Sequence, residues 1–353
     1  MPWNIINSVK TLPIKMAVGG TWIATGLTSG NTKLAKSNNG TTWTALTYSW
    51  TRDFYYNDIA YGKDNLGNYL WVAVGNVTGA TIATSPDGNT WTGATTAAFT
   101  TGFGIAYGKD GSGVGLWVCA CNGGTAPGNS IATSTDGINW TGRGRNGFAY
   151  GAKAVAYGKD GSGVGLWIAV SSEGENNAIA KSSNGTTWTT IVSNNIFTTS
   201  VLCVAYGKDG AGNGLWVAGV NGSTHVLATS PNGTVWAGKG YKSALASVKN
   251  VSYGNGLWVA CCNSSTNLVA ISSDGTTWNT VTINTSTIMT TFNCVKYGKD
   301  SSGNSFWLAT GSGNNNTHSF AKSIDGTIWT GAEGQNAFST QGNAIAFSEI
   351  INE

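Results

Sequence analysis

Glu173 and Glu175, in the segment SSEGENN, are the pair of carboxylates in this sequence to test first for acid–base chemistry. Most glycoside hydrolases need two carboxylates across a cleft, one to protonate the leaving oxygen and one to act as base or nucleophile. The other acidic residues outside the repeated turns described below are few, and Asp53, Asp58 and Glu333 are the ones expected on the same side of the molecule. A catalytic pair is therefore one hypothesis to weigh against a binding or structural role.

A second set of polar residues recurs in seven heptapeptides with Ser first, Asp or Asn third, Gly fourth and Trp seventh. They are SNNGTTW (37–43), SPDGNTW (85–91), STDGINW (134–140), SSNGTTW (182–188), SPNGTVW (230–236), SSDGTTW (272–278) and SIDGTIW (323–329). The third residues are Asn39, Asp87, Asp136, Asn184, Asn232, Asp274 and Asp325. Asn keeps the hydrogen-bond acceptor of Asp but not its charge, so the exchange predicts a hydrogen-bonded hairpin turn, not a metal site or a proton donor.

The repeat predicts the architecture. Its tryptophans are Trp43, Trp91, Trp140, Trp188, Trp236, Trp278 and Trp329, spaced 42 to 51 residues apart. Each unit contains four short strand-like pieces, for example residues 104–108, 116–120, 130–134 and 139–142. Four strands per unit at this period indicate a propeller blade. We therefore expect residues 1–353 to form one all-β domain, a seven-bladed β-propeller of four-stranded antiparallel blades, with the tryptophans buried between neighbouring blades.

Closure of the ring has two candidate strands. Residues 13–18, PIKMAV, are a candidate for the first strand of the first blade. Residues 343–348, NAIAFS, match residues 57–62, NDIAYG, and compete for the same place. Residues 3–6, WNII, resemble a fourth strand, and a strand exchanged with another subunit is the remaining alternative.

The heptapeptide resembles the Asp-box, also called the BNR repeat, and all seven copies carry its Ser, Gly and Trp. The resemblance implies a propeller with this motif at the third hairpin of each blade, on the rim opposite the usual ligand face. The family includes sialidases, glycan-binding lectins, assembly factors and domains of phage tail or virion proteins. Repeats reading YGNGLWVA followed by a heptapeptide look most like the last kind.

Antiparallel blades place their loops alternately on two faces. A repeated GKD sequence lies on the heptapeptide face, at Lys63–Asp64, Lys109–Asp110, Lys159–Asp160, Lys208–Asp209 and Lys299–Asp300. It predicts either a duplicated polar turn or a charged ring that holds calcium. Each copy offers one carboxylate, whereas a calcium site needs several oxygen ligands, which favours the turn.

The opposite face carries the blade-to-blade connections, which vary more and are the better place for a ligand. Aromatic rings there could stack on sugars, or fill the gaps between blades, and arginines could hold an anionic glycan, or act only as solubilising charge. The ligand-binding candidates are Arg52, Phe54, Tyr55, Phe99, Phe103, Arg143, Arg145, Phe148, Tyr150, Phe197, Tyr241 and Phe338.

Composition narrows the function classes. The formal net charge is +3, too small to indicate nucleic-acid binding. We expect no signal peptide and no membrane insertion, because no apolar run is long enough. The six cysteines lie in apolar strand-like runs and are expected to be small buried fillers. His225 and His318 fall in different blades, so we expect no metal site and no cofactor.

Three functional hypotheses follow. The first is a non-catalytic binding module of a phage or virion appendage, made in the host cytoplasm, that binds a cell-surface polysaccharide and other virion proteins; location at an extracellular surface is the alternative. The second is a purely structural decoration protein. The third is a sialidase-like glycosidase, which would need an arginine cluster, whereas this chain has only Arg52, Arg143 and Arg145.

Overall fold

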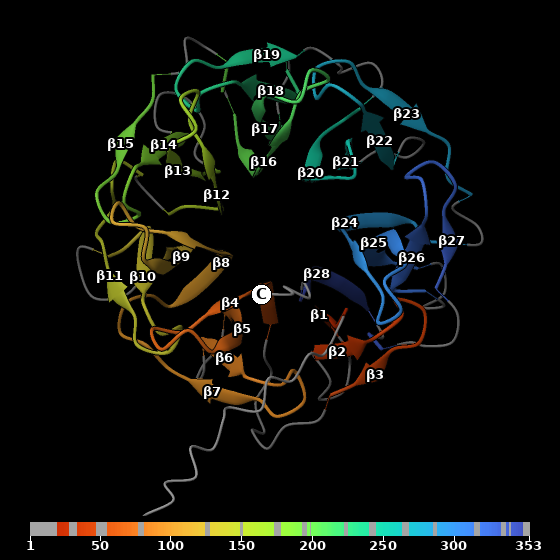
Figure 1. Cartoon of the computed structure of the whole chain (residues 1–353), viewed down its shortest axis with the longest axis horizontal. Helices are drawn as coiled ribbons and strands as arrows, with labels where there is room; N and C mark the ends of the chain where they lie inside the picture. The colour runs from red at the N-terminus through yellow and green to blue at the C-terminus, as the bar shows by residue number, and fades with distance from the viewer. Residues whose placement is uncertain are drawn as a thin grey trace, which may run out of the picture.

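The computed structural model describes residues 20–27, 34–46, 55–76, 81–123, 128–148, 151–172, 178–192, 196–197, 199–221, 225–239, 245–262, 268–284, 288–313, 318–332, 337–338 and 340–348. All regular elements among these residues are β-strands. The strands form antiparallel groups of four, two of which are joined by the pairing of Asn76 with Thr101, and Figure 1 shows these groups as sectors of a ring around a central axis. The protein is an all-β, seven-bladed β-propeller, as the repeat predicts.

Blades 2 to 7 follow the chain from the axis outward. Blade 2 contains β4 (Tyr55–Lys63), β5 (Tyr69–Asn76), β6 (Ile82–Ser85) and β7 (Thr92–Ala94), and blade 3 contains β8 (Thr101–Lys109), β9 (Gly115–Asn122), β10 (Ile131–Ser134) and β11 (Thr141–Gly142). Blade 4 contains β12 (Ala154–Lys159), β13 (Gly165–Val170), β14 (Ile179–Ser182) and β15 (Thr189–Thr190), and blade 5 contains β16 (Val201–Lys208), β17 (Gly214–Val220), β18 (Leu227–Ser230) and β19 (Ala237–Lys239). Blade 6 contains β20 (Val248–Gly254), β21 (Leu257–Cys262), β22 (Val269–Ser272) and β23 (Asn279–Val281), and blade 7 contains β24 (Thr291–Lys299), β25 (Ser305–Ser312), β26 (Phe320–Ser323) and β27 (Thr330–Gly331).

Blade 1 is assembled from both ends of the described chain. Its inner strand is β28 (Gln341–Phe347), which pairs with β1 (Trp22–Leu27), followed by β2 (Leu34–Ser37) and β3 (Thr44–Ala45). In Figure 1 the dark blue β28 lies beside the red β1. The segment 343–348 is therefore the one that takes the inner position. The competing segment 13–18 and the candidate fourth strand 3–6 lie outside the described residues.

Seven buried apolar clusters lie at the junctions between blades. In one of them Trp236 of blade 5 packs with Ile179 and Phe197 on the blade 4 side. The other six heptapeptide tryptophans occupy the same place at their own junctions. All are at most 8% exposed except Trp140, which is half-buried. The predicted burial of these indoles between blades is thus confirmed.

At five junctions the inner strands contact one another through a Tyr–Gly pair near their ends, and between blades 7 and 1 Phe347 takes the place of the tyrosine against Gly298. A Cβ placed on Gly108 of blade 3 would lie 2.3 Å from Cγ of Tyr157 of blade 4, and one on Gly158 would lie 2.3 Å from Cγ of Tyr206 of blade 5. In blades 3 to 7 the tyrosine ring therefore lies directly on the glycine of the preceding blade. Only a residue without a side chain leaves room for this contact, which explains the repeated YG sequence.

A second contact runs in the same direction. The indole nitrogen of a second-strand tryptophan donates to the carbonyl at the end of the preceding inner strand, as Trp216 does to Lys159 over 2.8 Å. The remaining bonds of this kind join Trp22 to Lys299, Trp117 to Lys63, Trp167 to Lys109 and Trp258 to Lys208, over 2.7 to 3.0 Å. The bond from Trp22 crosses the junction between blades 7 and 1, so the closing junction is built like the others.

The Tyr–Gly contact predicts a position-specific loss of stability. Gly108→Ala should lower the free energy of unfolding by about 1–3 kcal/mol, because the new methyl group overlaps the ring of Tyr157. Gly111→Ala is the matched control three residues away, since its Cβ would lie an ordinary 3.5 Å from Cβ of Asn184. Urea unfolding of both variants measures the difference. Equal stability of the two would contradict the contact.

Candidate binding surfaces around the central channel

The inner strands carry a β-bulge on the side of the ring where they begin. The pairing register shifts between Tyr56 and Asp58, and at the same point in β8, β16, β20 and β24. In blade 1 the register shift in β1 leaves Asn343 of β28 unpaired in the same way. A bulge redirects the side chain of its extra residue. The bulged residues are Asn57, Phe103, Leu202, Lys249, Asn293 and Asn343.

The bulged side chains reach the following blade. The amide of Asn57 donates to the carbonyl of Gly102 over 2.8 Å, and Asn293 and Asn343 make the same bond to the next inner strand. Lys249 donates to the side-chain oxygen of Asn293 over 3.2 Å. Asn57, Lys249, Asn293 and Asn343 form a polar collar, which lies on the face of the blade connections. The collar was not predicted from the sequence, because the heptapeptide lies between the outer strands and gives no information about the inner strand.

Two of the predicted candidates belong to or adjoin this collar. Phe103 is half-buried, and the ammonium of Lys153 from blade 4 lies 4.6 Å from its ring centroid. Burial lowers the pKa of Lys153 from its ordinary value. Tyr55, two residues before the bulge in β4, is 51% exposed and is a ring on this face with a free surface. A sugar could stack on such a ring.

The two described arginines lie in the connection from blade 3 to blade 4, and both are exposed. Nε of Arg143 donates to the hydroxyl of Thr133 over 2.8 Å, which fixes its stem against blade 3. The carbonyl of Arg145 accepts from the amide of Phe148 over 2.9 Å, so the segment around it is a closed turn. The candidates Arg52, Phe54, Tyr150 and Tyr241 lie outside the described residues.

Four other predicted ligand residues are buried, and the interpretation as stacking platforms is wrong for them. Phe99, Phe148, Phe197 and Phe338 are at most 1% exposed. Phe197 packs edge-on against Trp236 with ring centroids 5.6 Å apart, and Phe99 does the same against Trp140 over 5.9 Å. The four rings fill the gaps where one blade meets the next, and a buried ring has no face for a sugar.

The heptapeptide turns have the hydrogen bonds that the Asp/Asn exchange predicts. In the turn of Asp136, one carboxylate oxygen accepts from the amides of Ile138 and Asn139, each over 2.8 Å. The Ser134 hydroxyl donates to the same oxygen and accepts from the amide of Gly137. The amide oxygens of Asn39, Asn184 and Asn232 take the same two backbone bonds, and the carboxylates of Asp87, Asp274 and Asp325 do so too.

The GKD turns use their carboxylates in a similar way. Asp160 accepts from the amides of Ser162 and Val164 over 2.8 and 2.9 Å. The aspartates of the other four GKD turns accept the same two bonds. These bonds support the interpretation of GKD as a polar turn. Within the described part of the chain, no three His, Cys, Asp or Glu residues are grouped so that they could hold a metal ion.

Four aspartates lie in heptapeptide turns and five in GKD turns, and Asp58 is the one other acidic residue among those described. It too accepts hydrogen bonds from backbone N–H groups. Its two oxygens accept from Ile59 of its own strand and from Ile105 of blade 3, both over 2.9 Å. Burial raises the pKa of Asp58 above its ordinary value, although the bond from Ile105 and the attraction of Lys296 act in the opposite direction. Glu173, Glu175, Glu333 and Asp53 lie outside the described residues.

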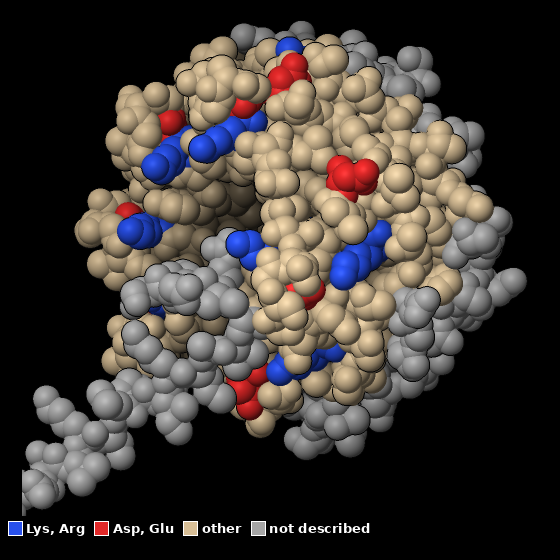
Figure 2. All heavy atoms as spheres, turned by 45° about the vertical axis from the view of Figure 1, so that its right-hand side comes forward, with Lys and Arg blue, Asp and Glu red and all other residues tan. Residues whose placement is uncertain are grey.

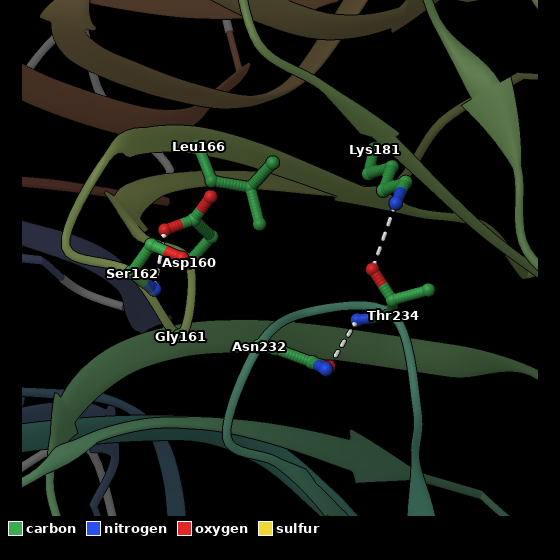
Figure 3. A pocket seen from close by; sticks show the side chains of 7 residues that line it. All are labelled: Asp160, Gly161, Ser162, Leu166, Lys181, Asn232 and Thr234. Atoms are coloured by element: carbon green, nitrogen blue, oxygen red, sulfur yellow. Dashed lines mark hydrogen bonds between the residues drawn. The ribbon is translucent and has the colours of Figure 1, made fainter.

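Two hollows among the described residues stand out as places for small molecules. The first is the central channel, of about 580 Å³, which is lined by the inner strands. The second is a groove of about 320 Å³ between blades 4 and 5 on the heptapeptide face, shown in Figure 3. In the groove, the ammonium of Lys181 donates to the Thr234 hydroxyl over 2.7 Å, and Asp160 and Asn232 are held by their own turns. The side chains of Lys181, Asp160 and Asn232 in the groove are therefore already hydrogen-bonded within the protein.

The surface charges are mixed in sign, and the cysteines lie in the core. Figure 2 shows basic and acidic side chains lying close to one another, with no large patch of one sign in that view. All six cysteines are buried and unpaired, as expected for small core residues. The imidazole of His225 packs against Gly238 of its own blade. No helix in the described chain is long and apolar enough to cross a bilayer.

Comparison with known proteins supports the fold. No family model matches the sequence, and no curated protein matches it either. Among solved structures, a GH74 enzyme of Niastella koreensis superposes with a TM-score of 0.54 at 16% identity, over 93% of this chain and 54% of that one. A GH74 xyloglucanase of Xanthomonas campestris gives 0.53 at 14% identity, over 88% and 46%. The computationally designed Ika8 protein gives 0.53 at 12% identity, over 92% and 90%.

These similarities are at the level of the propeller architecture. This chain spans about half the length of the two GH74 enzymes, and identities of 12 to 16% carry the fold and not the activity. What the chain binds must therefore be argued from its own residues.

The heptapeptide bonds predict a pH effect. Hydrogen bonds from Asn139, Ile138 and Ser134 outweigh burial and lower the pKa of Asp136 from 3.8 to about 2. A carboxyl whose pKa is lower in the folded state stabilises the fold above its unfolded pKa, and this contribution is lost as the pH falls toward its folded pKa. Asp136→Asn should therefore remove part of the stability loss between about pH 4 and pH 2 while remaining folded at pH 7. Urea unfolding at stepped pH measures this, and an unchanged pH profile would contradict the role.

The two classes of aromatic residue predict different effects. Phe197→Ala should lower the free energy of unfolding by about 3–5 kcal/mol, because it opens a cavity at the junction of blades 4 and 5. Tyr55→Ala, at a half-exposed position, should change it by about 0.5 kcal/mol or less. Chemical denaturation compares the two variants. A small effect of Phe197→Ala would show that the ring is not part of the junction.

Proposed function

We propose that this protein is a non-catalytic binding module of a phage or virion appendage that holds a host cell-surface glycan on its blade-connection face. The observation that carries the proposal is that the described carboxylates accept hydrogen bonds from the backbone. All ten described aspartates accept backbone N–H groups, and nine of them do so within repeated turns on the opposite face. The acids thus shape the scaffold.

The exposed chemistry of the connection face suits a glycan. It consists of a half-exposed ring, Tyr55, the exposed side chains of Arg143 and Arg145, and the amide-rich collar. Sugars bind through a ring face for their C–H surface and through donors and acceptors for their hydroxyls. Arginines add an attraction for carboxylate or sulfate groups, which favours an anionic polysaccharide.

The virion setting rests on the resemblance of the heptapeptides to the Asp-box. Proteins of this kind assemble in a host cytoplasm and act outside it, so the partners are the glycan and the neighbouring virion proteins. A location at an extracellular surface would use the same binding chemistry. The structural neighbours named as a GH74 enzyme and a GH74 xyloglucanase agree with a carbohydrate-related role.

A specific observation also favours a structural role, the second candidate. Seven exposed large apolar residues lie in turns of the heptapeptide face, and they are Leu66, Val114, Ile138, Val164, Val235, Ile324 and Ile328. Exposed aliphatic side chains at turn tips suit contact with another protein. Such a contact would attach the propeller through one face and leave the connection face free.

A sialidase-like glycosidase is the third candidate. The described residues supply two arginines, Arg143 and Arg145, and these are neighbours in one connection and not spread around a site. Turnover of a fluorogenic glycoside that is abolished by Glu173→Gln would support this candidate over the binding module.

The proposal predicts saturable glycan binding that depends on the connection face. Tyr55→Ala and Arg145→Ala should each weaken binding to a cell-surface polysaccharide by about tenfold, as expected for an exposed ring and a charged donor in an interface. Lys109→Ala, an exposed residue of the opposite face, is the matched control and should bind like the wild type. A glycan array followed by a whole-cell adsorption assay measures both. Absence of any signal at high protein concentration would contradict the proposal.

A further inference from the structure

The wall of the central channel has a position at which a single blade carries a positive charge and the other six carry a small uncharged residue. This position directly precedes the tyrosine or phenylalanine near the end of each inner strand. In blades 1 to 7 it is occupied along the channel wall by Ala346, Ala60, Ala106, Ala156, Ala205, Ser252 and Lys296. Six small residues and one lysine leave open space in front of the lysine side chain. The sevenfold repeat would not produce this asymmetry by itself.

The ammonium of Lys296 makes no hydrogen bond or ion pair with a described residue. Its side chain is half-buried in the channel wall, so it has lost part of its hydration, and the attraction of Asp58 is not accompanied by a hydrogen bond between the two. A desolvated ammonium carries a free-energy cost that a bound anion would offset. An ammonium offers three donors, and all are available to a ligand.

The groups around Lys296 limit the ligand class. Asp58 of blade 2 lines the channel, and each of its oxygens uses only one acceptor position on a backbone amide. Asn250 and Ser252 of blade 6, which adjoins blade 7, line the same space. Asn250 is held in place because its side-chain oxygen accepts from the amide of Val295 over 3.1 Å. Around Lys296 the wall thus offers this ammonium, a fixed carboxylate, an amide and a hydroxyl, and Lys63 of blade 2 is a second cation that lines the channel.

We propose that the central channel binds a small organic carboxylate that carries hydroxyl groups, of the class of acidic monosaccharides. The carboxylate of the ligand pairs with the Lys296 ammonium, and its hydroxyls donate to Asp58 and bond with Asn250 and Ser252. A volume of about 580 Å³ is in the range of small-ligand sites. The site is separate from Tyr55 and the arginines of the connection face, so it stands or falls independently of the polysaccharide binding proposed above.

The fixed carboxylate explains why a hydroxylated ligand is favoured over a simple anion. Asp58 repels an anion that approaches Lys296 without donors, whereas a hydroxyl group turns the same carboxylate into an acceptor. Inorganic phosphate at neutral pH carries more negative charge and few donors, so it meets this repulsion in full. The ligand is therefore distinguished by its hydroxyls as well as by its charge.

Titration calorimetry with sodium glucuronate, glucose and inorganic phosphate tests the proposal on the full chain. Glucuronate should bind saturably to the wild type and at least about tenfold more tightly than glucose, because glucose lacks the charge-assisted bond. Lys296→Met should weaken glucuronate binding by about tenfold or more. Lys299→Met, an exposed lysine at the end of the same strand, is the matched control and should leave it unchanged.

Several results would overturn the proposal. They are no binding of glucuronate, equal affinity for glucuronate and glucose, phosphate binding more tightly than glucuronate, and equal weakening by Lys296→Met and Lys299→Met. Thermal unfolding of the variants confirms that each is folded. If Lys296→Met does not fold, the comparison of glucuronate, glucose and phosphate on the wild type decides the question alone.

Discussion

The contact between a tyrosine ring and the glycine of the preceding blade is the constraint on which this propeller depends. The two inner strands approach so closely that a methyl group on the glycine would overlap the ring. The same approach brings the second-strand indole within 2.7 to 3.0 Å of the preceding carbonyl at five junctions. One steric and one polar contact, repeated in the same direction, therefore set the angle between blades. The closing junction has the same two kinds of contact, with Phe347 on Gly298 and the indole of Trp22 on the carbonyl of Lys299, so the ring closes there without a covalent link between its ends.

The inner strands fix the junctions, whereas the outer turns stabilise themselves and the connections fill the space between blades. The heptapeptide and GKD turns hold their own amides with Asp and Asn side chains, which is why charge can be exchanged for an amide there without loss of the turn. The connections send apolar residues into the junctions, a phenylalanine such as Phe148 in some blades and Leu245 in another. What remains exposed on the connection face is free to vary, and this is where we place binding.

The fold could be predicted from the sequence because its signals are local and repeated. A heptapeptide with Ser, Asp or Asn, Gly and Trp determines a hairpin and a buried indole, and seven copies determine the ring. Closure could not be predicted, because residues 13–18 and 343–348 are both plausible inner strands and the choice depends on long-range pairing with β1. The bulge at Asn57 was equally hidden, since no residue type marks it.

The site was predicted less well, for a physical reason. A phenylalanine next to polar residues in a connection looks the same in sequence whether it faces solvent or a neighbouring blade, and Phe99 and Phe197 proved to be buried. Tyr55 differs from them because it lies at the exposed start of an inner strand and not at a junction. Lys296 was overlooked because a single lysine gains meaning only when six other blades show a small residue at the same place.

Hydrogen exchange of the indole N–H groups, followed by NMR, tests the junction contact most directly. The account predicts that Trp22, Trp117, Trp167, Trp216 and Trp258 exchange only through global unfolding, with protection that is alike for all five, because each bond spans two blades. Rapid exchange of these indoles, or protection that differs widely from one blade to the next, would show that the blades are not held together by this contact.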